Sequence, residues 1–456
     1  MTLADPAFEP LPGARADFGR LGGSIYQIEV PAHWNGRLVL YMEGYGELRP
    51  IGLARVSPPL IRRYLIGQGF AWGASSFSST SLIPGRAADE TAALWDFFAR
   101  RYGRPTRTYL TGLSMGGMAT HIAAERYANR FDGALSLCGS ASLRRAISSE
   151  ADFFVAGAYA AGVTRREFNS DPHIGTLIHE RILPALRRRR AHRRFEDIMI
   201  SLTGGPRKFA REGLRQEEET NWQRAESLVG AGLASNRHTV YRLGPPSPVT
   251  SRAFNRAVIR LRPDNASLFR FLAGNRITGR LKMPLLTLHT TGDGQVPIEQ
   301  ARILQRRVDA AHRRRLLVQR VIRDPGHCGF TGTEWEAGLE ALVRWVEHGV
   351  RPKGNNVRIR HLNRLRRRFE LNPRPGTPEA DRVPGARRRV VLYGKLRLEG
   401  APFDARFLGA VVRRKDGLVT PCQLELSSVR RGRYRITVMA DREASGCGVR
   451  GARIAL

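Results

Sequence analysis

The sequence predicts an α/β fold: a mainly parallel sheet with helices on both faces, a helical insertion, and a small C-terminal β-sandwich. Three observations lead to this prediction. Short apolar runs alternate with helix-like segments over residues 20–140 and 283–350, which is typical of parallel pairing. This pattern is missing from residues 141–282, which are rich in Arg, Ala and Leu. Apolar and polar residues alternate in parts of 387–456, where glycines mark turns.

The first half of the chain contains the clearest alternation. Strands are expected at Leu38–Tyr41, Phe70–Ala74, Thr108–Gly112 and Gly133–Cys138. Residues Asp89–Tyr102 are expected to form a helix, because Leu94, Trp95 and Phe98 recur at helical spacing. Two later apolar runs, typical of buried parallel strands, are Pro284–His289 and Leu316–Ile322.

These patterns divide the chain into five segments. We expect the first part of the sheet at 1–140, a helical cap at 141–282, the second part of the sheet at 283–350, a linker at 351–386, and the β-sandwich at 387–456. The insertion begins at the carboxyl edge of the sheet, so it should cover a site at that edge. The linker is rich in Arg, Pro and Asn. Within the last segment, Tyr434, Ile436 and Val438 alternate with polar residues.

One serine lies in a context that favours nucleophilic chemistry. Ser114 follows an apolar run and precedes a helix-like segment, within the pattern G-x-S-x-G. A sharp strand-to-helix turn requires small neighbours, and Gly112 and Gly116 meet that need. Such a turn exposes the serine oxygen and leaves the amide of Met115 free to bind a developing oxyanion. The alternative is an ordinary Gly-rich connection.

A nucleophilic serine needs a base and a group that orients the base. Asp293 lies in a Gly-flanked turn after one expected strand, and His327 lies in a loop after the next. Their order behind the serine is that of serine, acid and base in enzymes with this turn. Asp324 is the rival acid, although it precedes the histidine closely. His121 and His289 also compete for the role of base, but we expect structural roles for both.

The loop after an early strand is expected to supply the second oxyanion donor. The sequence Glu43-Gly44-Tyr45-Gly46 follows the first of the expected strands. The backbone amide of Gly44 or Tyr45 is therefore the candidate donor. A simple Gly-rich turn is the alternative.

Together these residues resemble the α/β-hydrolase superfamily, and more narrowly a group of bacterial secreted serine hydrolases with GxSMGG and GHCxFT motifs. The matching segments are Trp34-Asn35-Gly36, Leu38 to Tyr41, Gly44-Tyr45, Gly112 to Gly117, Leu137-Cys138-Gly139 and Gly326 to Thr331. The resemblance covers about residues 20–140 and 283–350. In one departure, Glu43 stands where the relatives usually have His, beside the expected oxyanion site.

The resemblance and the residues together imply a serine hydrolase that cleaves carboxylic esters through an acyl-enzyme intermediate. Ser114 would attack, His327 would transfer the proton, and Asp293 would orient His327. No metal and no organic cofactor are expected. One alternative is a peptidase that uses the same triad. The other is a non-catalytic binding protein for an anionic polymer.

The net charge of +34 suggests an anionic partner. Arginine runs occur at 187–190, 313–315, 366–368 and 387–389. An Arg-rich face of this kind could bind an anionic polymer or a cell surface. Aromatic residues are not interleaved with these runs and no nucleic-acid motif appears, so specific nucleic-acid binding is not expected. The chain has no apolar run of about 18 residues, so no transmembrane helix is expected.

The four cysteines suggest two pairs. Cys422 and Cys447 lie in the expected β-sandwich and are expected to form a disulfide. Cys138 and Cys328 either form a second disulfide or remain buried thiols. Disulfides favour a secreted or cell-surface protein, whereas the first residues, from Met1 to Pro6, lack the pattern of a signal peptide. A cytoplasmic location is the alternative.

Overall fold

The computed structural model describes residues 8–45, 58–79, 81–170, 173–262 and 265–362, and separate strand segments from 369 to 455. The chain forms two compact units. The first comprises Met1–Phe330 and Trp335–Asn363, and the second comprises Thr331–Glu334 and Arg364–Leu456.

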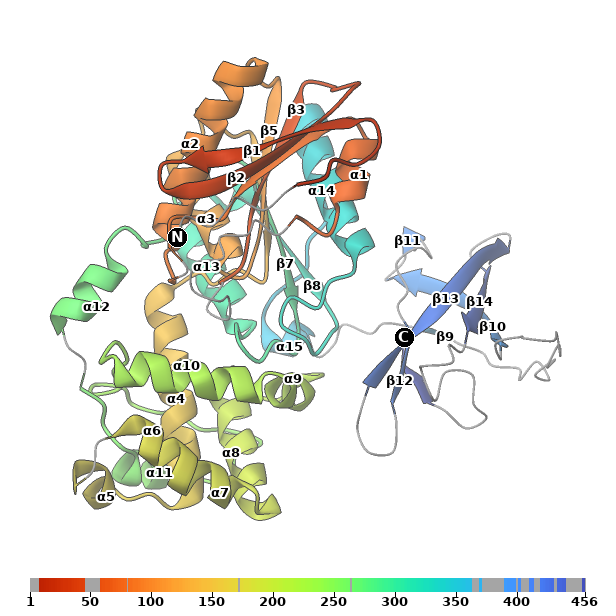
Figure 1. Ribbon diagram of the computed structural model, residues 1–456. Helices are drawn as coiled ribbons and strands as arrows, with labels where there is room; N and C mark the ends of the chain where they lie inside the picture. Colours follow the sequence, from red (N-terminus) through yellow and green to blue (C-terminus); the bar gives the residue numbers. More distant parts are fainter. Residues whose placement is uncertain are drawn as a thin grey trace. The chain divides into compact units, whose positions relative to one another are not determined.

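The first unit contains an eight-stranded sheet in the order β1-β2-β4-β3-β5-β6-β7-β8 (Figure 1). Its strands are β1 Ala14–Leu21, β2 Ser24–Pro31, β3 Arg37–Met42, β4 Ala71–Ser75, β5 Arg107–Leu113, β6 Gly133–Leu137, β7 Leu285–Thr290 and β8 Leu317–Ile322. All neighbours from β4 to β8 pair in parallel, whereas β1 and β2 are antiparallel additions at one edge. The mainly parallel sheet expected from the sequence is confirmed, and the carboxyl ends of β3, β5, β6, β7 and β8 meet at one edge.

Helices cover both faces of this sheet. They are α1 Arg62–Gly67, α2 Pro84–Tyr102, α3 Met115–Arg126, α13 Glu299–Ala310 and α14 Gly332–His348. Alternate residues of β3 enter two separate cores. Leu38 and Leu40 pack in the core that contains side chains of α2, α3 and α13. Val39 and Tyr41 pack in the core that contains side chains of α1 and α14.

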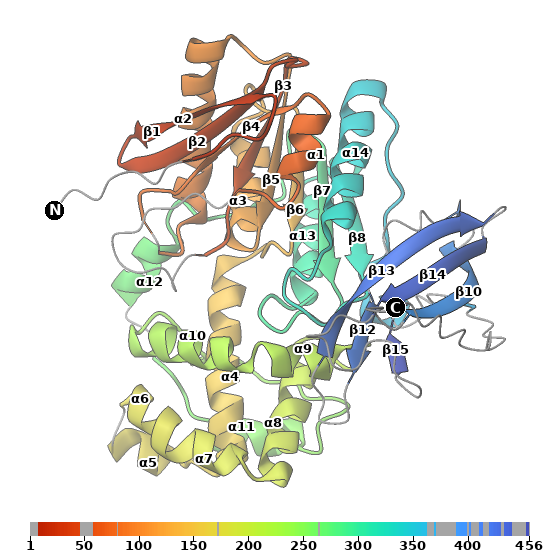
Figure 2. The same cartoon turned by 45° about the vertical axis from the view of Figure 1, so that its right-hand side comes forward.

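A helical insertion joins β6 to β7. Its helices are α4 Leu143–Ala161, α5 Arg165–Ser170, α6 Ile174–Thr176, the π-helix η1 Leu177–Ile182, α7 Leu183–Leu186, α8 Arg189–Leu202, α9 Ala210–Gln216, α10 Glu218–Gly230, α11 Ser251–Ala257 and α12 Asn265–Leu272. Figure 2 shows α4 running from the edge of the sheet into this group of helices. β6 and β7 are neighbours in the sheet, with Ala134 opposite Leu285.

The insertion has an aromatic core of its own. The Phe153 ring lies 4.9 Å from that of Phe195 and 4.6 Å from that of Trp222, centroid to centroid. Phe195 and Trp222 stack at 5.6 Å. These side chains are buried, so they stabilise the insertion through packing.

The described residues of the second unit form seven strands paired in the order β11-β10-β14-β13-β12-β15, with β9 against β10. They are β9 Phe369–Glu370, β10 Arg389–Leu398, β11 Ala401–Pro402, β12 Ala410–Arg413, β13 Val419–Val429, β14 Arg433–Met439 and β15 Arg453–Ala455. The alternating segment around Ile436 is therefore a strand, as expected. The β-sandwich remains a prediction, as does its disulfide, because Cys447 lies outside the described residues.

The first residues of the expected linker belong with the sheet. Asn355 donates its backbone N–H to Gln319 on β8 at 2.7 Å, and its side-chain oxygen accepts from Val321 at 2.8 Å. The short helix α15, Ile359–Leu362, follows. None of the described helices combines the length and the apolar character of a segment that crosses a bilayer.

Candidate active site

Ser114 lies in a tight turn between β5 and α3. Its backbone has φ 52° and ψ −111°, a conformation that L-residues rarely adopt. A Cβ atom added at Gly112 would lie 2.4 Å from the carbonyl oxygen of Gly116, and one added at Gly116 would lie 2.0 Å from that of Met42. The two glycines are therefore required for the chain to close around Ser114.

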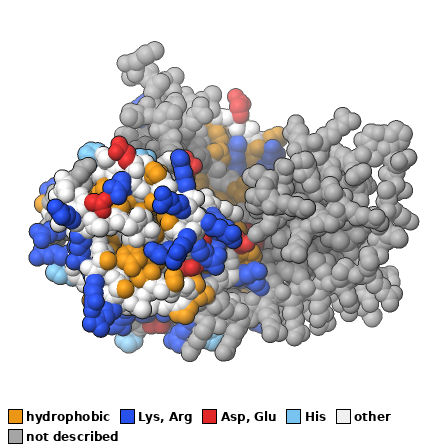
Figure 3. Space-filling model, turned by 90° about the horizontal axis from the view of Figure 1, so that it is seen from below, with side chains coloured by type: hydrophobic (Ala, Val, Ile, Leu, Met, Phe, Trp, Pro, Cys, Tyr) orange, Lys and Arg blue, Asp and Glu red, His pale blue; other side chains and the backbone are white. Residues whose placement is uncertain are grey.

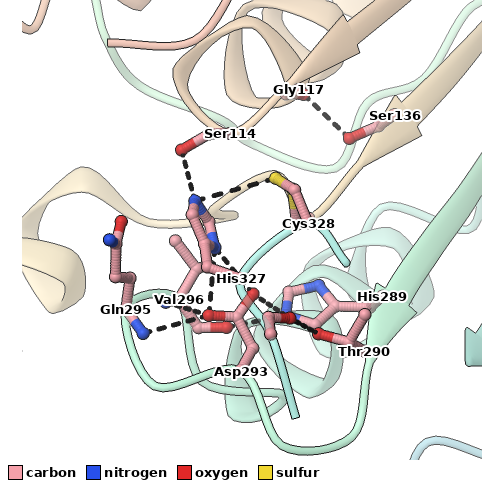
Figure 4. Close-up of a disulfide and its surroundings, with 12 residues drawn as sticks. Ser114, Gly117, Ser136, His289, Thr290, Asp293, Gln295, Val296, His327 and Cys328 are labelled. Carbon is pink, nitrogen blue, oxygen red and sulfur yellow. Dashed lines mark hydrogen bonds and ion pairs between the residues drawn. A yellow bond between two sulfur atoms is a disulfide. The ribbon is translucent and has the colours of Figure 1, made fainter. Parts of the chain in front are cut away.

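A continuous hydrogen-bonded path joins Ser114, His327 and Asp293 (Figure 4). Nε2 of His327 lies 2.8 Å from Oγ of Ser114. Nδ1 of His327 lies 2.8 Å from Oδ2 and 3.0 Å from Oδ1 of Asp293. Because a carboxylate accepts the Nδ1 proton, the neutral ring presents Nε2 as an acceptor to the serine hydroxyl.

The loop after β7 holds the Asp293 carboxylate in place. Its Oδ1 accepts backbone N–H groups from Gln295 at 3.0 Å and from Val296 at 2.7 Å. His289 stands behind this loop, where Nε2 donates to the Val296 carbonyl at 2.7 Å. Burial lowers the pKa of His289. The His289 ring therefore stabilises the loop of Asp293, which is a structural role.

The other rivals also occupy structural positions. The Asp324 carboxylate accepts the backbone N–H of Gly326 at 2.7 Å, so it shapes the loop that carries His327. Asp293, and not Asp324, faces Nδ1 of His327. His121 is buried within α3, and burial lowers its pKa to about 3.

The candidate oxyanion donors lie beside the serine. The amide of Met115 is at the N-terminus of α3, where backbone N–H groups and the helix dipole favour negative charge. Gly44 follows β3, and a Cβ added to it would lie 3.7 Å from Cβ of Ser114. Tyr45 is half-buried, whereas Glu43 is buried.

A disulfide joins Cys138, just after β6, to Cys328, the neighbour of His327. The two Cα atoms are 5.4 Å apart, and Sγ of Cys328 lies 3.7 Å from Nε2 of His327. These cysteines and His327 form the one cluster with metal-ligand spacing found in the described part of the chain. With the disulfide closed neither sulfur is a thiolate, so the trio is a poor fit for a soft metal ion.

Sequence reasoning missed the contacts that the insertion makes with the loops of Asp293 and His327. Glu217, between α9 and α10, accepts hydrogen bonds from both loops. Nothing in its sequence neighbourhood distinguishes it from the adjacent surface carboxylates.

No protein-family model and no curated protein sequence matches this chain. Similar solved structures include feruloyl esterase B from Aspergillus oryzae, at 14% identity, covering 73% of this chain and 80% of that chain, with a TM-score of 0.41. An esterase from Pyrococcus furiosus has 10% identity, 73% and 90% coverage, and a TM-score of 0.39. An acylaminoacyl peptidase from Pyrococcus horikoshii has 11% identity, 76% coverage of this chain, and a TM-score of 0.39. This chain spans 44% of the length of that peptidase.

Proposed function

We propose that this protein is a serine hydrolase that cleaves carboxylic esters through an acyl-enzyme intermediate. The hydrogen-bonded path from Ser114 through His327 to Asp293 carries the proposal. Such a path supplies a nucleophile, a general base and an orienting acid in one line.

The reaction follows from these positions. His327 accepts the Ser114 proton at Nε2 while Oγ attacks the ester carbonyl carbon. The backbone amides of Met115 and of Gly44 or Tyr45 stabilise the oxyanion. The tetrahedral intermediate expels the alcohol, which takes the proton from His327. Water then attacks the acyl-enzyme by the same route and releases the acid.

Esters rank before peptides because their alkoxide leaving group departs more readily than an amine. In this proposal the helical insertion acts as a cap that selects the acyl group. Its contacts with the loops of Asp293 and His327 support that role. The Cys138–Cys328 disulfide supports an oxidising compartment, hence secretion.

Labelling with a fluorophosphonate tests the proposal, because this probe reacts with activated serines. We expect labelling at Ser114 and hydrolysis of 4-nitrophenyl esters. Ser114→Ala should abolish labelling and lower turnover by roughly 10⁴–10⁶. The matched control is Ser148→Ala, since Ser148 on α4 only bonds the Arg144 carbonyl of its own helix.

Three results would redirect the proposal. Faster cleavage of peptidyl anilides than of matched esters would favour the peptidase. An unlabelled protein that binds anionic polymers would favour the binding protein. If the Ser114→Ala variant kept most of its activity, Ser114 would not be the nucleophile.

A further inference from the structure

One carboxylate of the helical insertion contacts both loops that carry the proposed base and acid. Oε1 of Glu217 accepts the backbone N–H of His327 at 3.3 Å. Oε2 of Glu217 accepts from Nε2 of Gln295 at 2.7 Å. His327 follows β8 and Gln295 follows β7, so Glu217 links loops from two neighbouring strands.

Gln295 extends this link to the proposed acid. Its backbone N–H donates to Oδ1 of Asp293 at 3.0 Å, a bond that is drawn in Figure 4. Its Oε1 accepts from Arg224 of α10 at 3.5 Å. Arg224 pairs with Glu150 of α4 at 3.1 Å. Because Arg224 is a donor and Glu217 is an acceptor, the Gln295 amide has one favoured orientation.

The backbone around Glu217 is seated on the same two loops. A Cβ atom added at Gly213 of α9 would lie 1.9 Å from the carbonyl oxygen of Gly292 and 2.3 Å from that of Pro325. Arg207 donates through Nε to the carbonyl of Thr291 at 2.9 Å. Asn221 donates to the carbonyl of Gly294 at 3.1 Å. The segment 207–221 therefore packs directly against both loops.

We infer that Glu217 is a positioning residue, which holds the loops of Asp293 and His327 in register. The inference rests on the proposed function, because it assigns a role in the same reaction. Glu217 contacts the backbone of His327, and the ring stays available to Ser114 and Asp293. Loss of Glu217 should therefore affect the alignment for the chemical step more than the binding of substrate.

The test replaces Glu217 by Met, which has a similar length and lacks acceptor oxygens. We expect kcat for a 4-nitrophenyl ester to fall roughly 10- to 100-fold, because small misalignments are costly, while KM stays within about twofold. Glu217→Gln keeps one acceptor and should recover most of the rate. Glu219→Ala is the matched control, since Glu219 is an exposed carboxylate on α10. It should behave like the wild type.

Amide hydrogen exchange supplies a readout that does not depend on turnover. In Glu217→Met, residues 291–296 and 325–330 should exchange faster, whereas β5 and α3 should not change. If both loops loosen but the wild type is not labelled by the fluorophosphonate, the positioning role stands and the proposed function fails.

Unchanged kcat together with unchanged exchange in Glu217→Met would overturn the inference. A rise in KM with kcat preserved would also overturn it, because Glu217 would then contribute to substrate binding. If Glu217→Met does not fold, Gln295→Ala removes the bond to Oε2 of Glu217 and the longer bond from Arg224, and it leaves the bond between Oε1 of Glu217 and the His327 backbone. Wild-type kcat and wild-type loop exchange in that variant would refute the link.

Discussion

His327 and Asp293 lie 34 positions apart on different loops, yet Nδ1 of His327 is 2.8 Å from Oδ2 of Asp293. The carboxylate also accepts two backbone N–H groups, so its position does not depend on the histidine. A carboxylate held in this way selects the ring tautomer with the proton on Nδ1.

Replacing Asp293 by Asn should therefore disable the base without unfolding the protein. The amide can donate to Nδ1, which favours the wrong tautomer, and kcat should fall by roughly 10³–10⁴. Steady-state kinetics on an activated ester measures this effect. Asp324→Asn should cost at least tenfold less, because Asp324 bonds the backbone of Gly326. If Asp324→Asn lowered kcat more than Asp293→Asn, Asp324 would be the acid.

Opening the Cys138–Cys328 disulfide should lower both stability and turnover. The closed loop spans 190 residues, and the chain-entropy estimate for such a loop is about 5 kcal/mol. Urea unfolding of Cys138→Ser would measure the loss. Turnover should fall because Cys328 adjoins His327. Cys422→Ser, in the second unit, should leave the unfolding of the first unit unchanged. Equal midpoints for the wild type and Cys138→Ser would contradict the stabilising role.

Acidification should destabilise the fold through His121. Its folded pKa of about 3 lies below the ordinary value of 6.5, because burial disfavours the charged ring. The contribution of His121 to the free energy of unfolding is complete above pH 6.5. It is lost as the pH falls from 6.5 towards 3, because over that range only the unfolded chain takes up the proton. The free energy of unfolding then falls by about 1.4 kcal/mol per pH unit.

Denaturant unfolding between pH 4 and 8 checks the His121 prediction. His121→Gln should show a shallower decline than the wild type, even if its stability at pH 8 is lower. Parallel curves for the two proteins would mean that His121 takes up its proton in the folded state as well.

A truncation after Asn363 should leave turnover of a small ester nearly unchanged. The second unit supplies none of Ser114, Asp293 and His327, and the cut respects the packing of Asn355 against β8. Any effect should appear on polymeric or surface-bound esters. If the truncated protein stays folded but loses activity on small esters, the second unit must complete the site.

The disulfide Cys422–Cys447, with a loop of about 25 residues, would contribute roughly 3 kcal/mol to the stability of the second unit.

The arginines at the junction of α7 and α8 should bind anionic polymers. Arg187, Arg188, Arg189 and Arg190 are all exposed. The insertion lies at the bottom of Figure 1, and Figure 3, seen from below, shows many Lys and Arg side chains among few acidic ones. Replacing the four by Gln should weaken binding to polyphosphate about tenfold or more at low salt and leave ester turnover unchanged. Replacing Arg313 to Arg315 is the control. Equal losses from both sites would indicate diffuse attraction by the whole surface.

The sequence was informative wherever a local pattern determines the structure. The glycines around Ser114 predict the turn, because no larger residue fits at their positions. The apolar run before Asp293 marks β7. By contrast, the antiparallel pair β1 and β2 was not expected. Every residue of β2 is buried, whereas the residues of β1 are exposed or half-buried. The role inferred for Glu217 depends on where α9 and α10 dock, which no local pattern records.

The connection of the insertion to neighbouring strands has an evolutionary consequence. Since β6 and β7 pair directly, the chain can leave the sheet and return to it without disturbing a single ladder. Lineages are thus free to lengthen, shorten or exchange this module while the sheet is inherited intact. This freedom does not extend to α9, because a side chain at Gly213 would collide with the loops of Asp293 and His327. A chimaera that carries a foreign module would need an equally small residue where the module contacts these loops, whatever the rest of the module recognises.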